Sequence, residues 1–120
     1  MGNTPTARVG TVMIDCNDLD VMVEFWGKVL GLEAKARYPS YVWMSRLSGD
    51  GPAIAFQLVP EPKTIKNRLH LDLTADDRDG FVALVESLGG SRIADHEVQG
   101  LQWTILADPE GNEFCVTDAH

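Results

Sequence analysis

The sequence predicts an α+β fold made of two similar halves, each with the element order β-α-β-β-β. Alternating apolar and polar residues indicate strands, and apolar residues three or four positions apart indicate one helix in each half. The halves also match at a nearly constant offset. Three matched pairs are each 59 residues apart: Thr11 and His70, Asp18 and Asp77, and Gly31 and Gly90. A pseudo-twofold repeat is the simplest explanation of both observations.

The first half begins with an alternating, β-rich segment over Arg8–Cys16, which predicts a strand. A helix of about 12 residues follows, because Asn17 or Asp18 can cap its start and Gly31 suits its end. Turn residues then separate the remaining apolar runs. Three more strands are expected, around Glu33–Tyr38, Tyr41–Leu47 and Ala53–Val59.

The second half repeats this order. A strand is expected at Leu69–Thr74, with Leu69, Leu71 and Leu73 facing the helices and His70, Asp72 and Thr74 on the opposite face. Asp76 or Asp77 can cap a helix that ends at Gly89-Gly90. The last three strands are expected near Arg92–Val98, Leu101–Ala107 and Glu113–Thr117.

Length and composition indicate one domain over residues 1–120, with one module at about 8–60 and the other at about 67–118. Cys16 and Cys115 lie far apart with no CxxC motif, so we expect neither a disulfide nor a structural zinc site. The sequence shows no signal peptide or apolar run of membrane-spanning length, and a cytoplasmic location is expected. A net charge of −8 disfavours nucleic-acid and membrane partners.

Three segments resemble the vicinal oxygen chelate superfamily, which includes glyoxalase I, bleomycin-resistance proteins and extradiol dioxygenases. They are VGTVMIDCNDLDVMVEFWGKVLGLE, IAFQLVPEPKTIKNRLHLDLTADD and DPEGNEFCVTD. Within that superfamily the chain is most similar to the uncharacterised glyoxalase-like group. The resemblance implies the glyoxalase/bleomycin-resistance/dihydroxybiphenyl dioxygenase fold, a cavity for a small molecule, and often a divalent metal ion. It also implies a homodimer, which fits the exposed sheet edges of two small modules.

The metal ligands of that superfamily, carried over, fall on Thr11, Gln57, His70 and Cys115. Only His70 is a good ligand for a Lewis-acid metal, since Gln57 is a weak neutral donor and Cys115 favours softer ions. Glu113 lies two residues before Cys115 on the same strand face and is a candidate replacement for the missing carboxylate. The metal candidates are therefore Gln57, His70 and Glu113.

Other interpretations of these residues stay open. His70 is either a site residue, and then the candidate catalytic group, or a structural histidine bonded to Asp72 or Gln57. Cys115 with His70 is either a nucleophile and its base or a small strand residue beside it. Trp43 and Trp103, 60 residues apart in matching strands, either line a cavity or pack in the core.

The basic cluster Lys63, Lys66 and Arg68 is either a solvated linker or the mouth of a pocket.

Two functional hypotheses follow, and metal content separates them. The incomplete ligand set favours a small-molecule binder that needs no metal cofactor. Its pocket residues would be Trp43, Gln57, His70, Asp72, Trp103 and Cys115. The alternative is a metal-dependent lyase or isomerase of the glyoxalase type, in which a divalent ion stabilises an enolate-like intermediate. A dioxygenase is disfavoured because Thr11 replaces the first histidine, and a pure interaction module remains a third class.

Overall fold

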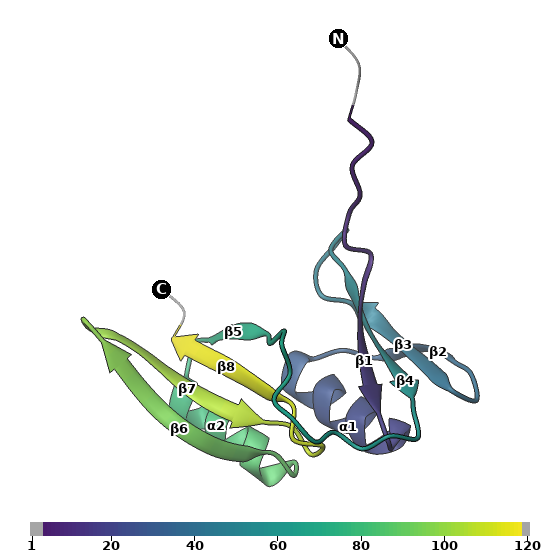
Figure 1. Ribbon diagram of the computed structural model, residues 1–120. Helices are drawn as coiled ribbons and strands as arrows, with labels where there is room; N and C mark the ends of the chain where they lie inside the picture. Colours follow the sequence, from purple (N-terminus) through teal and green to yellow (C-terminus); the bar gives the residue numbers. More distant parts are fainter. Residues whose placement is uncertain (1–3, 119–120) are drawn as a thin grey trace.

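Two four-stranded sheets, each covered by one helix, make up the structure (Figure 1). The computed structural model describes residues 4–118, so the outermost ends of the predicted domain lie outside the described residues. Module 1 contains β1 (Thr11–Cys16), α1 (Leu19–Leu30), β2 (Ala34–Arg37), β3 (Tyr41–Arg46) and β4 (Ala53–Leu58). Module 2 contains β5 (Asp72–Ala75), α2 (Arg78–Ser87), β6 (Ser91–Val98), β7 (Leu101–Ala107) and β8 (Glu113–Asp118).

Both sheets have the same topology, which confirms the predicted repeat of βαβββ units. The strand orders are β1-β4-β3-β2 and β5-β8-β7-β6. In each module the first strand runs parallel to the last, and the other neighbours are antiparallel. The helix crosses over between the first strand and the rest of the sheet. As a result β1 and β5 are both edge strands.

The predicted starts of both helices and the predicted end of α1 are confirmed, whereas α2 ends at Ser87, just before the predicted Gly89-Gly90. The Asp18 carboxylate accepts a hydrogen bond from the backbone N–H of Val21, and Gly31 ends α1 in the left-handed conformation. In α2 the Asp77 carboxylate accepts a hydrogen bond from the backbone N–H of Gly80, in the first turn of the helix. These caps fix where each helix starts relative to its preceding strand.

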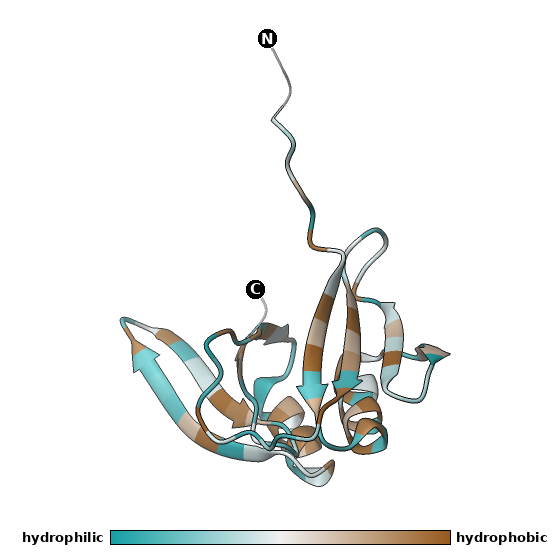
Figure 2. Cartoon of the chain, turned by 45° about the vertical axis from the view of Figure 1, so that its right-hand side comes forward, coloured by the Kyte–Doolittle hydropathy of each residue, from teal (hydrophilic) through white to brown (hydrophobic). Residues whose placement is uncertain are grey.

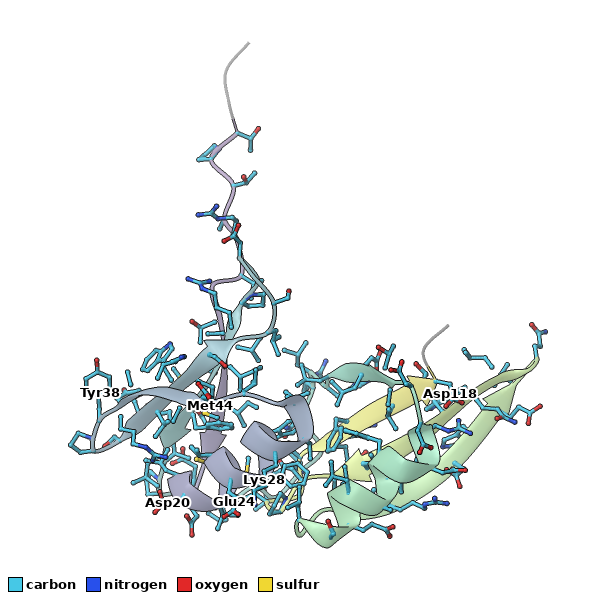
Figure 3. All side chains as sticks on the ribbon, turned by 180° about the vertical axis from the view of Figure 1, so that it is seen from behind. Asp20, Glu24, Lys28, Tyr38, Met44 and Asp118 are labelled. Carbon is cyan, nitrogen blue, oxygen red and sulfur yellow. The ribbon has the colours of Figure 1, made fainter. Side chains whose placement is uncertain are left out.

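Each sheet has one face packed against its helix and one face without a helix, which we call the open face. In β3, Val42 and Met44 are buried under α1, while the alternating neighbours Tyr41 and Trp43 point the other way. Figure 2 shows the hydrophobic residues of the strands as brown bands. Both helices lie on the same side of the molecule, behind the strands in Figure 1 and in front of them in Figure 3. The two open faces therefore share the opposite side.

An aromatic cluster joins the cores of the two modules. Trp26 of α1 packs on Phe114 of β8 with ring centroids 4.8 Å apart, and Phe25 contacts both rings at 5.2 and 6.2 Å. Gly90 permits this close approach, because a Cβ there would lie 3.0 Å from the Phe25 ring and 2.7 Å from the Ala107 carbonyl oxygen. A side chain at Gly90 would therefore clash with Val85 and Ala107 within module 2 as well as with Phe25 across the joint.

The turn between β7 and β8 adds polar contacts to this joint. Asp108 is only 3% exposed, and its carboxylate accepts hydrogen bonds from Trp26 Nε1 at 3.1 Å and from the N–H groups of Glu110 and Asn112. The Glu110 carboxylate reaches module 1, where it accepts from the backbone N–H groups of Asn17 and Asp18 at 2.8–3.0 Å. Negative charge is favourable at this helix start.

Two predicted strand starts are wrong. Regular pairing of β1 begins at Thr11 rather than Arg8, and β5 begins at Asp72 rather than Leu69. The β5–β8 pairing begins at Asp72 and Cys115, with the Cys115 N–H donating to the Leu71 carbonyl, so the residues before Leu71 are not part of this ladder. Leu71 and Leu73 pack against the core as predicted, but Leu69 is 78% exposed. His70 therefore lies in an irregular segment ahead of β5.

No helix within residues 4–118 is long and apolar enough to cross a membrane.

Replacing Asp108, the buried carboxylate at the joint, should destabilise the whole fold. Asp108→Ala leaves the buried Trp26 N–H and the N–H groups of the turn without an acceptor, and we expect a loss of about 2–4 kcal/mol in the free energy of unfolding. Urea denaturation measures it. Asp50→Ala, an exposed loop substitution, is the control and should change stability by less than about 0.5 kcal/mol. An Asp108→Ala variant as stable as this control would contradict the role assigned to the joint.

Candidate functional site

Three potential ligand groups meet on the open face of module 2. The side-chain donor atoms of His70, Asp72 and Cys115 all lie within 4.8 Å of one another. Asp72 and Cys115 are opposite each other in the parallel β5–β8 pair, so the sheet register fixes their proximity. His70 comes from the irregular segment just before β5, with Nε2 lying 3.4 Å from Asp72 Oδ1.

The environment of Cys115 disfavours nucleophilic chemistry. Burial, followed by the negative charge of Asp72, raises the pKa of the Cys115 thiol above its ordinary value of 9.0. The thiol form therefore dominates at neutral pH, whereas a nucleophile needs the thiolate. Burial and the Glu110 charge raise the pKa of Cys16 to about 11, so that thiol is also unreactive.

An aromatic group occupies the open face of module 1. The Trp43 indole packs against Tyr41 and Tyr38, with ring centroids 5.8 and 6.5 Å apart. Its Nε1 donates a 3.5 Å hydrogen bond to the Thr11 hydroxyl, which orients the ring. Trp43 stays partly exposed because α1 lies on the other side of the sheet. We call Tyr38, Tyr41 and Trp43 the module 1 aromatic group.

A matching aromatic group lies on module 2. Trp103 of β7 stacks on His96 of β6, with centroids 5.3 Å apart and planes 22° from parallel. The antiparallel pairing of β6 with β7 sets these two residues opposite each other. Sequence reasoning missed this partner of Trp103, although the alternation of both strands could have indicated it. Figure 3 shows Tyr38 and Asp118, one from each module, at opposite ends of the molecule.

The remaining predicted site residues are divided between the modules. Gln57 lies on β4, opposite Asp15 of β1 and Tyr41 of β3, and belongs to the module 1 open face. Glu113 starts β8, where its carboxylate lies 3.8 Å from Lys66 Nζ. The structure thus brings His70 together with Asp72 and Cys115 in one module, and places Gln57 in the other.

A cavity of about 500 Å³ opens at the joint between the modules. Its walls come from β1, the linker, the segment around His70 and the start of β8. Apolar side chains form part of the lining: Val12, Ile14, Trp26, Leu71 and Phe114. Lys63 and Arg68 of the basic cluster also line it, as do His70 and Glu113. The sequence predicts a cavity between the modules, but of the six pocket residues that it predicts only His70 lines this one.

The residues present do not fit the metal set implied by the resemblance. That set requires strong donors from both modules, yet Thr11 contributes a hydroxyl that already accepts the Trp43 N–H. Gln57 offers only a neutral amide oxygen, and Cys115 stands where a carboxylate is expected. Mg²⁺ and Mn²⁺ prefer carboxylate and other oxygen ligands, and so this set is unsuited to them.

Comparison with known proteins agrees with this architecture. A family model described as "Glyoxalase-like domain" matches residues 11–117. A glyoxalase/bleomycin resistance protein/dioxygenase family enzyme from Burkholderia phytofirmans PsJN is 22% identical, with a TM-score of 0.77, over 95% of this chain and 100% of its own. A glyoxalase/bleomycin resistance protein from Albidiferax ferrireducens T118 is 25% identical, with a TM-score of 0.69, over 92% and 98%.

A lactoylglutathione lyase from Agrobacterium tumefaciens has the same fold, at 20% identity and a TM-score of 0.66 over 97% of this chain and 96% of its own. No significant match was found among proteins with curated descriptions. The family model spans nearly the whole chain, including both modules and the joint between them. The protein therefore belongs to the glyoxalase-like domain family.

Proposed function

We propose that the protein binds a small planar molecule against the open faces of its sheets, without the metal set of its better-known relatives. Its main support is the pair of aromatic groups on those faces, Trp43 with two tyrosines and Trp103 with His96. Large aromatic side chains are normally used in the core, where they bury most area. Here they lie on the faces that the helices do not cover.

Polar groups beside these rings could orient such a ligand. Gln57 lies in register with Tyr41 on module 1, and His70 lies near Cys115 on module 2. Small-molecule sites typically combine apolar walls with a few polar groups that fix orientation. The similar structure from Albidiferax ferrireducens T118 is named a glyoxalase/bleomycin resistance protein, a name that includes resistance to a small molecule as well as an enzyme.

The proposal includes a homodimer in which the open faces are covered by a partner subunit. In a single chain they expose apolar side chains such as Met13, and both edge strands β1 and β5 lack a partner on one side. Burying such surface is favourable, and a two-fold axis would pair identical patches. The two aromatic groups lie apart within one chain, so face-to-face pairing of subunits could bring them around one ligand.

A metal-dependent lyase or isomerase is the second candidate. It is favoured by the cluster around His70 and by the fold shared with a lactoylglutathione lyase. In this case His70, helped by Gln57 or Glu113, would hold an ion that stabilises developing negative charge on an enolate. We rank it second because Gln57 lies on the other module and Glu113 lies next to Lys66. A dioxygenase ranks lower still.

Replacing His70 should weaken ligand binding without unfolding the protein. Planar aromatic compounds that raise the melting temperature of the wild type would first be selected and their affinity measured by calorimetry in the presence of a chelator. His70→Ala should then lose about 1–3 kcal/mol of binding free energy, as expected for one buried hydrogen bond. Trp103→Leu should also weaken binding, since it removes a stacking surface.

Ser87→Ala, on the helix side, is the matched control and should bind like the wild type. If His70→Ala and Trp103→Leu bind every selected compound as tightly as the wild type, the proposed site is wrong. Activity that disappears with chelator would instead support the metal-dependent alternative.

Scattering should report a dimer. At micromolar concentration we expect a mass of twice the 13.2 kDa chain mass by small-angle scattering. Met13→Glu places a charge on the open face and should shift the mass toward the monomer. Val21→Glu is the control, because Val21 is equally exposed, at 41% against 37% for Met13, but lies on α1. A wild-type mass near 13.2 kDa would refute the dimer.

A further inference from the structure

We infer that His70, Asp72 and Cys115 form a site for a thiophilic divalent metal ion, of which Zn²⁺ is the reference, within module 2 alone. This set differs from the one that the resemblance implies, which takes ligands from both modules. It replaces a carboxylate with a thiolate and adds Asp72, which has no counterpart in that set. The inference goes beyond the proposed binding of a planar ligand, with which it shares His70.

Geometry supports the three-residue set. Bonds of about 2.0–2.3 Å from a tetrahedral ion place neighbouring ligand atoms roughly 3.3–3.8 Å apart. The His70 Nε2 and Asp72 Oδ1 atoms already lie 3.4 Å apart, and all three donors lie within 4.8 Å. To reach the spacing of a tetrahedral site, the donor atoms need to move together by only about an ångström, which side-chain rotation can supply. Both His70 and Asp72 have room to rotate, since their side chains are 45% and 76% exposed.

The backbone holds two of the ligands in place. Asp72 and Cys115 are register partners in the parallel β5–β8 pair, and the Cys115 N–H donates to the Leu71 carbonyl at 2.9 Å. The alternation of β5 and β8 directs both side chains to the open face, away from the side of the partly buried Leu73 and the buried Val116. His70 is two residues ahead of Asp72 in a segment without strand pairing, so it can adjust to an ion. Two ligands on a backbone held by strand pairing and one on an adjustable segment suit metal entry.

The chemistry of the donors selects the ion. A thiolate, an imidazole and a carboxylate together are typical ligands of Zn²⁺, and they suit Co²⁺ and Cd²⁺ as substitutes. Mg²⁺ and Mn²⁺ prefer oxygen ligands and should bind poorly. The two negative charges of a thiolate and a carboxylate balance a divalent cation. Three protein ligands would leave the fourth position facing the open face, where an exogenous donor atom could bind.

Cobalt substitution tests the site directly. Chelator-treated, reduced wild-type protein would be titrated with Co²⁺ and followed by absorption. We expect a thiolate-to-cobalt charge-transfer band in the near ultraviolet that saturates at one ion per chain. Zn²⁺ should abolish the band by displacement, and an excess of Mg²⁺ or Mn²⁺ should leave it unchanged.

Variants identify the ligands. Cys115→Ser should eliminate the charge-transfer band, whereas Asp72→Asn and His70→Ala should keep it and weaken Co²⁺ affinity by about 10- to 100-fold, as losses around metal sites commonly do. Cys16→Ala is the matched cysteine control and should bind like the wild type. Melting temperatures without metal would show that each variant folds, and Zn²⁺ should raise the melting temperature of the wild type and of Cys16→Ala more than that of the ligand variants.

The inference is overturned if the wild type shows no charge-transfer band at stoichiometric Co²⁺, or if the band survives in Cys115→Ser. It is also overturned if Gln57→Ala or Glu113→Gln weakens Co²⁺ binding as much as Asp72→Asn does, because the ligands would then span other residues. Planar-ligand binding measured with chelator present is a separate readout, so failure here leaves the proposed binding function testable on its own.

Discussion

The buried carboxylate of Asp108 determines how the two modules are placed, and the rest of the structure depends on that placement. A charge with 3% exposure is costly unless donors replace its water. Here the donors come from both sides of the joint, Trp26 from module 1 and the N–H groups of the turn from module 2. Satisfying this one group therefore requires both modules to be docked. Glu110 then extends the same turn to the start of α1.

This docking explains why the helices share one side and the open faces share the other. Each sheet covers only one of its faces with its own helix, so the repeat leaves two uncovered faces per chain. The joint also separates the edge strand β1 from the segment ahead of β5, and the cavity of about 500 Å³ lies in that gap. The open faces and the cavity thus have the same origin. Each sheet has a helix on only one face, and the polar turn between β7 and β8 docks the two sheets together.

Much of the fold could be predicted from the sequence because it depends on local signals. Asp18, Gly31 and Asp77 have the cap chemistry that ends helices, and the structure uses them as expected. Alternation predicted one face for His70 and Asp72, and their donor atoms lie within 4.8 Å of each other and of Cys115. The start of β5 could not be predicted, because Leu69 alternates like a strand residue but has no neighbouring strand beside it. The joint was missed for the same reason: the burial of Asp108 depends on Trp26, 82 residues earlier in the chain.

The division into a packed face and an open face also explains how donor types can vary at a site without loss of the fold. The backbone of Cys115 is held by its pairing with Leu71 and Asp72, whatever side chain it has. A half-buried thiol behaves there as a small apolar residue and costs little in packing. Its packed neighbours Phe114 and Val116, by contrast, are fully buried and cannot change so freely. An open-face position can therefore exchange a carboxylate for a thiol, changing which ions and ligands the module prefers, while the adjacent core positions keep the strand in place.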